Sequence, residues 1–186
     1  VAGELAAGGR IDLLGCNVVE DEAGELFLAK LEDLTSVNFA ASTDATGNDA
    51  YGGDWVLESD DIDVSSTYFD PDLIDGFEGL LQKPVYNGGL PPMITVEQGQ
   101  YNTSDVIYTI PAGTWTDPTP SHTLTYGIAN APSWLGFTKA TQEFYLKQPI
   151  EEWQVDTISD VKVTVMDPVY NFDQETIKFN AINAND

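Results

Sequence analysis

Residues 131–137, Ala-Pro-Ser-Trp-Leu-Gly-Phe, decide the fold of the C-terminal half of this chain. Alanine, proline and serine open the stretch, and the large apolar side chains of Trp134, Leu135 and Phe137 follow within four positions. Large aromatic and aliphatic side chains gathered in this way favour a position between two packed sheets. We interpret these three residues as anchors of a β-sandwich core.

Short runs that alternate apolar and polar residues surround this stretch from residue 84 onward. They occupy residues 106–110, 123–128, 144–146, 161–165 and 176–179. Pro, Gly, Asn and Asp separate the runs, as turn residues separate short strands. About seven strands in roughly 100 residues are typical of a sandwich, so an all-β fold is predicted for residues 84–186.

The N-terminal half has a different pattern, in which strand-like and helix-like stretches alternate. Residues 11–14, 37–41 and 54–57 are predicted strands. A helix is predicted between the first two, with one apolar face made of Ala23, Leu26, Phe27, Leu31 and Leu34. The order strand, helix, strand predicts an α/β unit over residues 1–58. The acidic residues 59–83 are predicted to be a linker between the two halves.

The charge of the chain is strongly one-sided. Asp and Glu total 31, Lys and Arg total 7, and the net charge is −24. Such a surface repels phosphate backbones and anionic membranes, so a nucleic-acid-binding function is excluded and membrane binding is disfavoured. Dense carboxylates attract calcium, although they also serve simply to keep a protein soluble.

We expect no segment of this sequence to insert into a membrane or to direct the chain to one. No apolar run approaches the roughly 20 residues that span a bilayer. The first residues, Val1-Ala2-Gly3, are neither an initiator Met nor a signal peptide. We therefore expect an internal segment of a longer protein. Asn102-Thr103-Ser104 is a glycosylation sequon that agrees with an extracellular location.

Three motifs of the N-terminal half resemble one known family. They are Gly-Arg-Ile-Asp-Leu-Leu-Gly-Cys-Asn-Val at 9–18, Ala-Ala-Ser-Thr-Asp-Ala-Thr-Gly-Asn at 40–48 and Gly-Gly-Asp-Trp-Val-Leu-Glu at 52–58. Together they resemble an uncharacterised caspase-like domain of giant bacterial surface adhesins. The resemblance covers residues 1–58 and implies only the C-terminal, incomplete part of that α/β domain. We expect another polypeptide or an upstream segment to complete it.

The same resemblance places Cys16 at the position of a cysteine-peptidase nucleophile. Such a nucleophile needs a base, usually His, to form the thiolate. The chain has a single His, His122, which lies in the β-rich half and is interpreted as a surface residue. Cys16 is therefore expected to be vestigial or structural, and the chain is not expected to be an enzyme. The alternative is a processed fragment of a larger cysteine peptidase.

Three motifs of the C-terminal half resemble a second family. Residues 110–117, 131–137 and 163–167 resemble the dystroglycan-type cadherin-like domain, an Ig-like sandwich, and the likeness covers residues 84–186. Cadherin-like modules stack in tandem and use calcium at their junctions. The resemblance implies calcium ligands at four positions, which are Asp117, Asp167, Asn185 and Asp186.

The match to this second family is incomplete. Thr119 stands where the family often has an acid, and Leu146-Lys147-Gln148 lacks the glycine usual before Pro149. The alternative for Asp117 and Asp167 is that they only shape turns.

The leading hypothesis is a structural or adhesive segment of a large secreted or cell-surface protein. It would be a spacer or docking module in an extracellular assembly or filament, possibly stiffened by calcium. Its partners would be neighbouring modules or copies of the same protein. A second alternative is a carbohydrate-binding module, which would need outward-facing aromatic side chains, with Trp115, Tyr108 and Tyr145 as the candidates.

Overall fold

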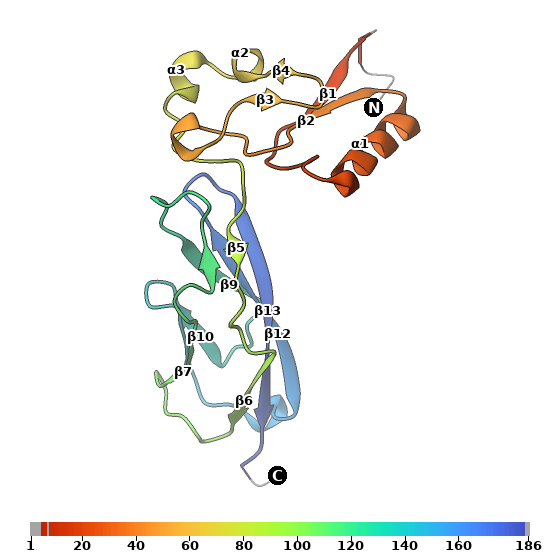
Figure 1. Ribbon diagram of the computed structural model, residues 1–186. Coiled ribbons are helices and arrows are strands. Elements are labelled where there is room, and N and C mark those ends of the chain that lie inside the picture. Colours follow the sequence, from red (N-terminus) through yellow and green to blue (C-terminus); the bar gives the residue numbers. More distant parts are fainter. Residues whose placement is uncertain (1–4, 7, 185–186) are drawn as a thin grey trace. The chain divides into compact units, whose positions relative to one another are not determined.

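The computed structural model describes residues 5–6 and 8–184, and the chain divides into two compact units (Figure 1). Unit 1 is Val1–Gln82 and unit 2 is Lys83–Asp186. Within the described ranges, no helix is long and apolar enough to cross a membrane.

Unit 1 is built around a parallel pair of strands joined by a helix. The elements are β1 (Arg10–Leu13), α1 (Glu22–Thr35) and β2 (Asn38–Ala41), and β1 pairs with β2 so that Ile11 lies opposite Phe39. The carboxylate of Asp21 caps α1 by accepting the N–H of Gly24 at 2.9 Å, which satisfies one of the free donors of the first turn. This strand–helix–strand order agrees with the sequence prediction.

The face that α1 buries differs from the predicted one. Leu28 is buried and Leu31 partly so, and both pack against Val19, Val37 and Phe39. Leu26, Phe27 and Leu34, all predicted to face the core, are instead 63%, 52% and 69% exposed.

The reason for this rotation is the close approach of the helix at Gly24. A Cβ on this residue would lie 2.3 Å from the carbonyl oxygen of Val18, so only glycine allows the contact. The helix therefore turns the face that carries Gly24, Leu28 and Leu31 toward the strands, and the larger apolar side chains are left outside.

Residues 59–82, predicted to be a linker, are part of unit 1. They follow η2 (Asp49–Tyr51) and β3 (Val56–Leu57) and contain β4 (Ile62–Asp63), α2 (Ser65–Tyr68) and α3 (Pro71–Ile74). Val64 is fully buried beside Leu57 and Ala40, and Leu80 is 5% exposed. The N–H of Leu81 also donates to the carbonyl of Thr46 at 2.8 Å. Isolated apolar residues among the many acids provide this packing, which charge composition alone does not reveal.

Unit 2 is a β-sandwich. Its strands are β5 (Val85–Tyr86), β6 (Met93–Glu97), β7 (Val106–Thr109), β8 (Trp115–Thr116), β9 (Thr125–Ala129), β10 (Leu135–Thr138), β11 (Glu143–Leu146), β12 (Thr157–Met166) and β13 (Phe172–Ile182), with η3 (Glu152–Gln154) before β12. One sheet has the order β6-β13-β12-β9, another β10-β11-β7, and β5 pairs with β8. The runs predicted as strands in this half all lie in or overlap these strands.

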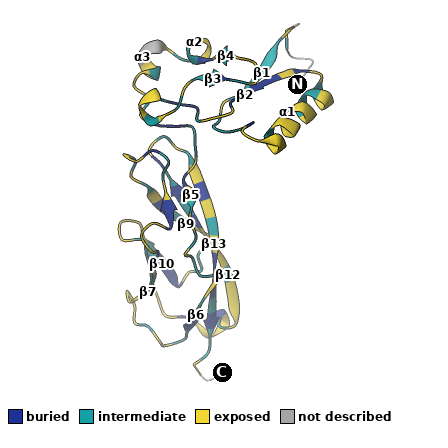
Figure 2. Ribbon diagram, viewed as in Figure 1, coloured by how far each residue is buried: buried dark blue, intermediate teal, exposed yellow. Residues whose placement is uncertain are grey.

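The core of unit 2 lies between the two sheets (Figure 2). Trp134 is 1% exposed, and its ring lies 6.3 Å from that of Phe179, whereas Phe144 of the opposite sheet lies 5.0 Å from Phe179. Leu135 is buried and Phe137 packs 4.8 Å from Phe144. The prediction that Trp134, Leu135 and Phe137 are core anchors is therefore confirmed.

The chain enters and leaves unit 2 at opposite ends of β13. Lys83, the first residue of the unit, makes a 2.6 Å ion pair with Asp173, close to where β13 begins. The indole N–H of Trp115 donates to the same carboxylate at 3.0 Å. Eleven residues of β13 span roughly 34 Å to Ile182. Figure 1 shows β5 near one end of β12 and β13 and the last residues of β13 at the other.

The carboxylate of Asp173 gives a pH-dependent contribution to the stability of this end. Burial by itself would raise the pKa of Asp173, but the hydrogen bonds from Lys83 and Trp115 and the charge of Lys83 lower it below its ordinary value. A lowered folded-state pKa stabilises the fold above the unfolded pKa of about 4, and this stabilisation is lost as the pH falls through the folded pKa.

We expect Asp173→Asn to destabilise unit 2 at neutral pH, with a difference from the unaltered chain that shrinks as the pH falls below about 4. Thermal unfolding of both proteins across this pH range measures the effect. Asp160→Asn, at an exposed position of β12, is the matched control and should show no such pH-dependent difference. A stability difference for Asp173→Asn that stays constant down to the lowest pH would contradict the assignment.

Candidate functional site

Two loops of unit 2 bring three metal-ligating side chains together. Asp117 and His122 lie in the loop between β8 and β9, and Asp167 begins the turn between β12 and β13. Thr125, the first residue of β9, pairs with Met166, the last residue of β12, so these loops meet at one end of the larger sheet. One ligand atom from each of the three residues lies within 4.8 Å of the others.

Asp117 is fixed by its own loop. Its Oδ1 accepts the backbone N–H of Thr119 at 2.7 Å, and the carbonyl of Thr119 accepts the N–H of His122 at 3.0 Å. The side chain of Asp117 is 5% exposed. Among the residues that the structure describes, none donates a hydrogen bond to its second oxygen, Oδ2, although this atom is buried. A buried carboxylate oxygen without a donor is energetically costly.

Asp167 is held in a five-residue turn that ends at Asn171. Its Oδ1 accepts the N–H of Asn171 at 2.8 Å, and its Oδ2 accepts the side-chain amide of the same residue at 2.9 Å. The N–H of Asp167 donates in return to the carbonyl of Asn171 at 3.0 Å. Asp167 is only 2% exposed. Asp117 and Asp167 thus both shape turns, as one sequence hypothesis holds, and both also converge on one cluster.

His122 is the residue that sequence reasoning missed. It was interpreted as a surface residue, but its side chain is only 6% exposed and its Nδ1 lies 3.3 Å from Oδ1 of Asp117. The proximity of Asp117 and His122 in the sequence was the available signal, because a single turn can bring both side chains to one point. The position of Asp167 beside them depends on strand pairing and cannot be read from local sequence.

The described residues fit calcium poorly. Calcium takes six to eight oxygen ligands, whereas this cluster offers two carboxylates and an imidazole nitrogen. The other two predicted ligands, Asn185 and Asp186, lie outside the described residues. The cluster offers a mixed set of ligands, in which Asp117 and Asp167 supply oxygen atoms and His122 supplies a nitrogen atom.

A surface hollow gives access to the cluster. Asp117, Thr119, His122, Thr123 and Gln142 contribute to its lining. Two of the three residues of the cluster, Asp117 and His122, therefore lie at the wall of this hollow.

Cys16 has the surroundings of a structural cysteine. Its sulfur accepts the N–H of Thr46 at 3.2 Å and lies 3.4 Å from the carbonyl of the same residue. Burial raises the pKa of the Cys16 thiol, and the nearby charge of Asp44 adds to this effect, while hydrogen bonds from the backbone oppose it. A raised pKa lowers the fraction of reactive thiolate. The one His of the chain belongs to unit 2, so unit 1 contains no His that could act as a base.

Unit 1 also contains an acidic cluster of Asp44, Asp54 and Glu58. Burial raises the pKa of Asp44, and the charges of Glu58 and Asp54 raise it further. Asp44 and Asp54 are exposed, and Glu58 accepts the N–H of Thr43. Exposed carboxylates that repel one another in solvent are common without a bound ion, so this cluster is not a candidate site.

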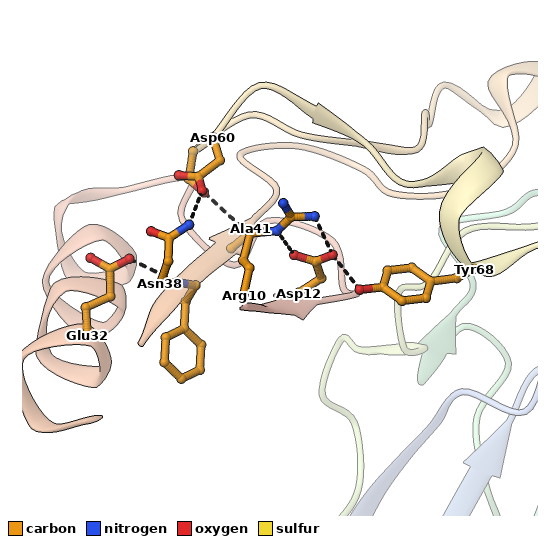
Figure 3. A network of polar contacts seen from close by, with 9 residues as sticks. Arg10, Asp12, Glu32, Asn38, Ala41, Asp60 and Tyr68 are labelled. Atoms are coloured by element: carbon orange, nitrogen blue, oxygen red, sulfur yellow. Dashed lines mark hydrogen bonds and ion pairs between the residues drawn. The ribbon is translucent and has the colours of Figure 1, made fainter. Parts of the chain in front are cut away.

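A network of polar contacts joins β1 to α2, and further polar contacts join β2 to residues that lie close to it (Figure 3). The guanidinium of Arg10 pairs with the carboxylate of Asp12, and the hydroxyl of Tyr68 donates to Asp12 at 2.6 Å. The hydrogen bond from Arg10 is the main reason that the pKa of Asp12 lies below its ordinary value. Nearby, the amide of Asn38 donates to Asp60 at 2.5 Å. These contacts are satisfied within unit 1 and have a structural role.

The aromatic residues predicted for carbohydrate binding do not form an exposed platform. Trp115 is buried at 3% exposure, and Tyr108 and Tyr145 are partly buried. The ring of Tyr145 lies over Gly136, its partner in the adjacent strand. The exposed aromatic side chains of unit 2 are others, among them Trp153 and Tyr170 at 76% and 78%.

Each match to a known protein family or structure covers only part of the chain. The profile of a family described as "Domain of unknown function (DUF4347)" matches residues 1–81, a range close to unit 1. Among curated proteins, none matches the chain.

The solved structures that are similar to this chain include cadherin extracellular domains. Human mucin-like protocadherin EC1-2 is 12% identical with a TM-score of 0.46, over 55% of this chain and 54% of that structure. Human protocadherin-24 EC1-2 is 18% identical with a TM-score of 0.43, over 55% and 44%. The human desmocollin-1 ectodomain is 16% identical with a TM-score of 0.42, over 53% and 20%. This chain thus spans about half or less of each of these structures, and the likeness concerns the fold of one part.

Proposed function

We propose that this chain is a structural or adhesive segment of a large secreted or cell-surface protein, in which unit 2 is a spacer between neighbouring modules. The observation that carries the proposal is the placement of the chain ends of unit 2. The chain enters beside Asp173 and leaves after Ile182, at opposite ends of β13. The unit also closes its own core between two sheets. Modules with these two properties can be strung end to end.

The strand pairing supports a load-bearing role. β6 runs parallel to the last part of β13, with Met93 opposite Lys178 and Ile182 opposite Glu97. A force applied at both ends of unit 2 pulls β6 and β13 in opposite directions along their length. All hydrogen bonds between the two strands are then loaded together instead of one after another.

We expect single-molecule force spectroscopy on the full chain to show one unfolding peak for unit 2. The contour length should then increase by roughly 3.6 Å per residue of this unit. Ile94→Pro removes a backbone N–H that the strand register directs at β13, and it should lower the unfolding force. Ile94→Ala shortens the same side chain but keeps the N–H, and it is the control. Extension of unit 2 without an unfolding peak, or an equal unfolding force in Ile94→Pro and Ile94→Ala, would contradict the spacer role.

Unit 1 offers a surface for docking to a neighbouring module of the same protein. Leu26, Phe27 and Leu34 are exposed along α1, and within the described residues the sheet beneath consists of only β1 and β2. Parallel sheets are nearly always larger and covered on both faces. An exposed apolar stripe beside such a small sheet supports a partner that covers it.

We expect the double variant Leu26→Gln and Phe27→Gln to keep the unfolding free energy of unit 1 within about 0.5 kcal/mol, because both side chains are exposed. The same variant should reduce binding of a hydrophobic fluorescent dye and any concentration-dependent association seen by sedimentation. Leu28→Gln, which alters the buried neighbour, is the control and should cost about 3 kcal/mol. A stable double variant with unchanged dye binding and association would exclude this surface as a docking site.

Calcium binding at Asp117 and Asp167 stays a prediction. The resemblance of residues 84–186 to cadherin-like modules favours it, whereas the imidazole of His122 beside Asp117 disfavours it. The titrations described in the next subsection compare calcium with other ions on the same chain.

The alternative of a cysteine-peptidase fragment depends on the reactivity of Cys16. Because burial raises the pKa of this thiol, we expect slow reaction with Ellman's reagent at neutral pH in the folded chain. Unfolding in urea should raise the rate at least about tenfold, since the thiol then becomes exposed and regains its ordinary pKa. Labelling of the folded chain as fast as that of the unfolded chain would instead favour the peptidase alternative.

A further inference from the structure

We propose that Asp117, His122 and Asp167 form a site for a divalent transition-metal ion that accepts mixed nitrogen and oxygen ligands, with zinc as the representative ion, and that the site prefers such an ion to calcium. The three side chains come from two loops that meet at one end of the larger sheet of unit 2. The proposal goes beyond the spacer function, and binding of the ion does not depend on that function.

Charge is the first argument for a cation. The side chain of Asp117 is 5% exposed and Asp167 is 2% exposed, and their carboxylates belong to one cluster. Two carboxylates removed from water repel one another, and each also loses hydration. No Lys or Arg side chain within the described residues makes an ion pair with either carboxylate. A divalent cation between them would offset both costs.

The second argument concerns the carboxylate oxygen Oδ2 of Asp117. Across the described part of the chain, Oδ2 of this residue has no hydrogen-bond donor although it is buried. The other oxygen, Oδ1, is already fixed by the N–H of Thr119. The carboxylate is therefore held in place by one oxygen while the other keeps a ligand position available. Asp117 and His122 also line a surface hollow, which places the cluster close to solvent.

The third argument concerns the identity of the ion. Zinc binds imidazole nitrogen and carboxylate oxygen together in tetrahedral sites. Nδ1 of His122 lies 3.3 Å from Oδ1 of Asp117, so the imidazole lies beside the carboxylate whose other oxygen, Oδ2, has no hydrogen-bond donor among the described residues. Calcium requires more oxygen ligands than this cluster supplies, and imidazole is not among its usual ligands. Two carboxylates and one imidazole leave the fourth position of a zinc ion to water from the hollow.

A bound ion would tie the loop 117–122 to the turn 167–171. Both lie at the end of unit 2 where the chain enters, near the ion pair of Lys83 with Asp173. The ion would therefore stiffen the end of the sandwich that receives force from the preceding part of the chain. This last consequence rests on the spacer function, whereas ion binding itself does not.

The test is a calorimetric titration of the full chain with zinc, calcium and magnesium chloride. It is carried out on Cys16→Ser, because a thiolate is itself a zinc ligand. We expect one zinc ion per chain, a raised unfolding temperature with zinc, and calcium binding at least on the order of 100-fold weaker. His122→Asn, which keeps a polar side chain but removes both imidazole nitrogens, should weaken zinc binding on the order of 100-fold or more.

Asp54→Asn, in the exposed acidic cluster of unit 1, is the matched control and should leave zinc binding unchanged. Zinc affinity that is equal in His122→Asn and the parent chain would show adventitious binding to surface carboxylates and overturn the proposal. So would calcium binding that is tighter than zinc binding, or no zinc binding at all.

A second measurement does not require the His122 variant to fold. X-ray absorption at the zinc edge of the zinc-loaded Cys16→Ser chain reports the ligands directly. A four-coordinate shell with one imidazole and carboxylate oxygens is expected, whereas a six-coordinate shell of oxygen atoms alone would overturn the proposal. Failure of the pulling experiment would refute the spacer function and leave both of these results unaffected.

Discussion

The pairing of β12 with β13 governs the arrangement of unit 2. The two strands form an antiparallel ladder from Thr157 opposite Ala181 to Met166 opposite Phe172. Along it, Val161, Val163 and Val165 alternate with solvent-facing neighbours, so a slip of one residue would turn three buried valines outward. The ladder fixes the turn that begins with Asp167 and thereby the position of its carboxylate. It also sets the distance between the residues where the chain enters and leaves the unit.

The strands of unit 2 were predictable because their signals are local. Alternation of apolar residues identified β7, β9, β11, β12 and β13, and the group Trp134, Leu135 and Phe137 identified the core. The candidate site was only half predictable. Asp117 and Asp167 were singled out through a family resemblance, and the structure places their carboxylates together. His122 was taken for a surface residue because burial of a lone polar side chain depends on loops that pack over it.

Unit 1 shows a second limit of sequence reasoning. The apolar pattern of α1 identified the helix correctly but not the face that it buries. Close packing at Gly24, where a Cβ would collide with the Val18 carbonyl, determines this face, and a glycine carries no hydrophobic signal. The extent to which the residues after β3 are folded was also underestimated, because a high density of acids suggests a linker. A few buried side chains such as Val64 and Leu80 are enough to fold that segment onto the rest of the unit.

The order of strands in the larger sheet has a consequence for biosynthesis. β13 is the last strand of unit 2 in the sequence, yet it lies inside the sheet between β6 and β12. β6 therefore has no partner in this sheet until residues 172–182 have left the ribosome, and the core stays open until then. The strands β7, β10 and β11 can pair with one another earlier, but the larger sheet is complete only when β13 is available, so the core of unit 2 closes in a late step.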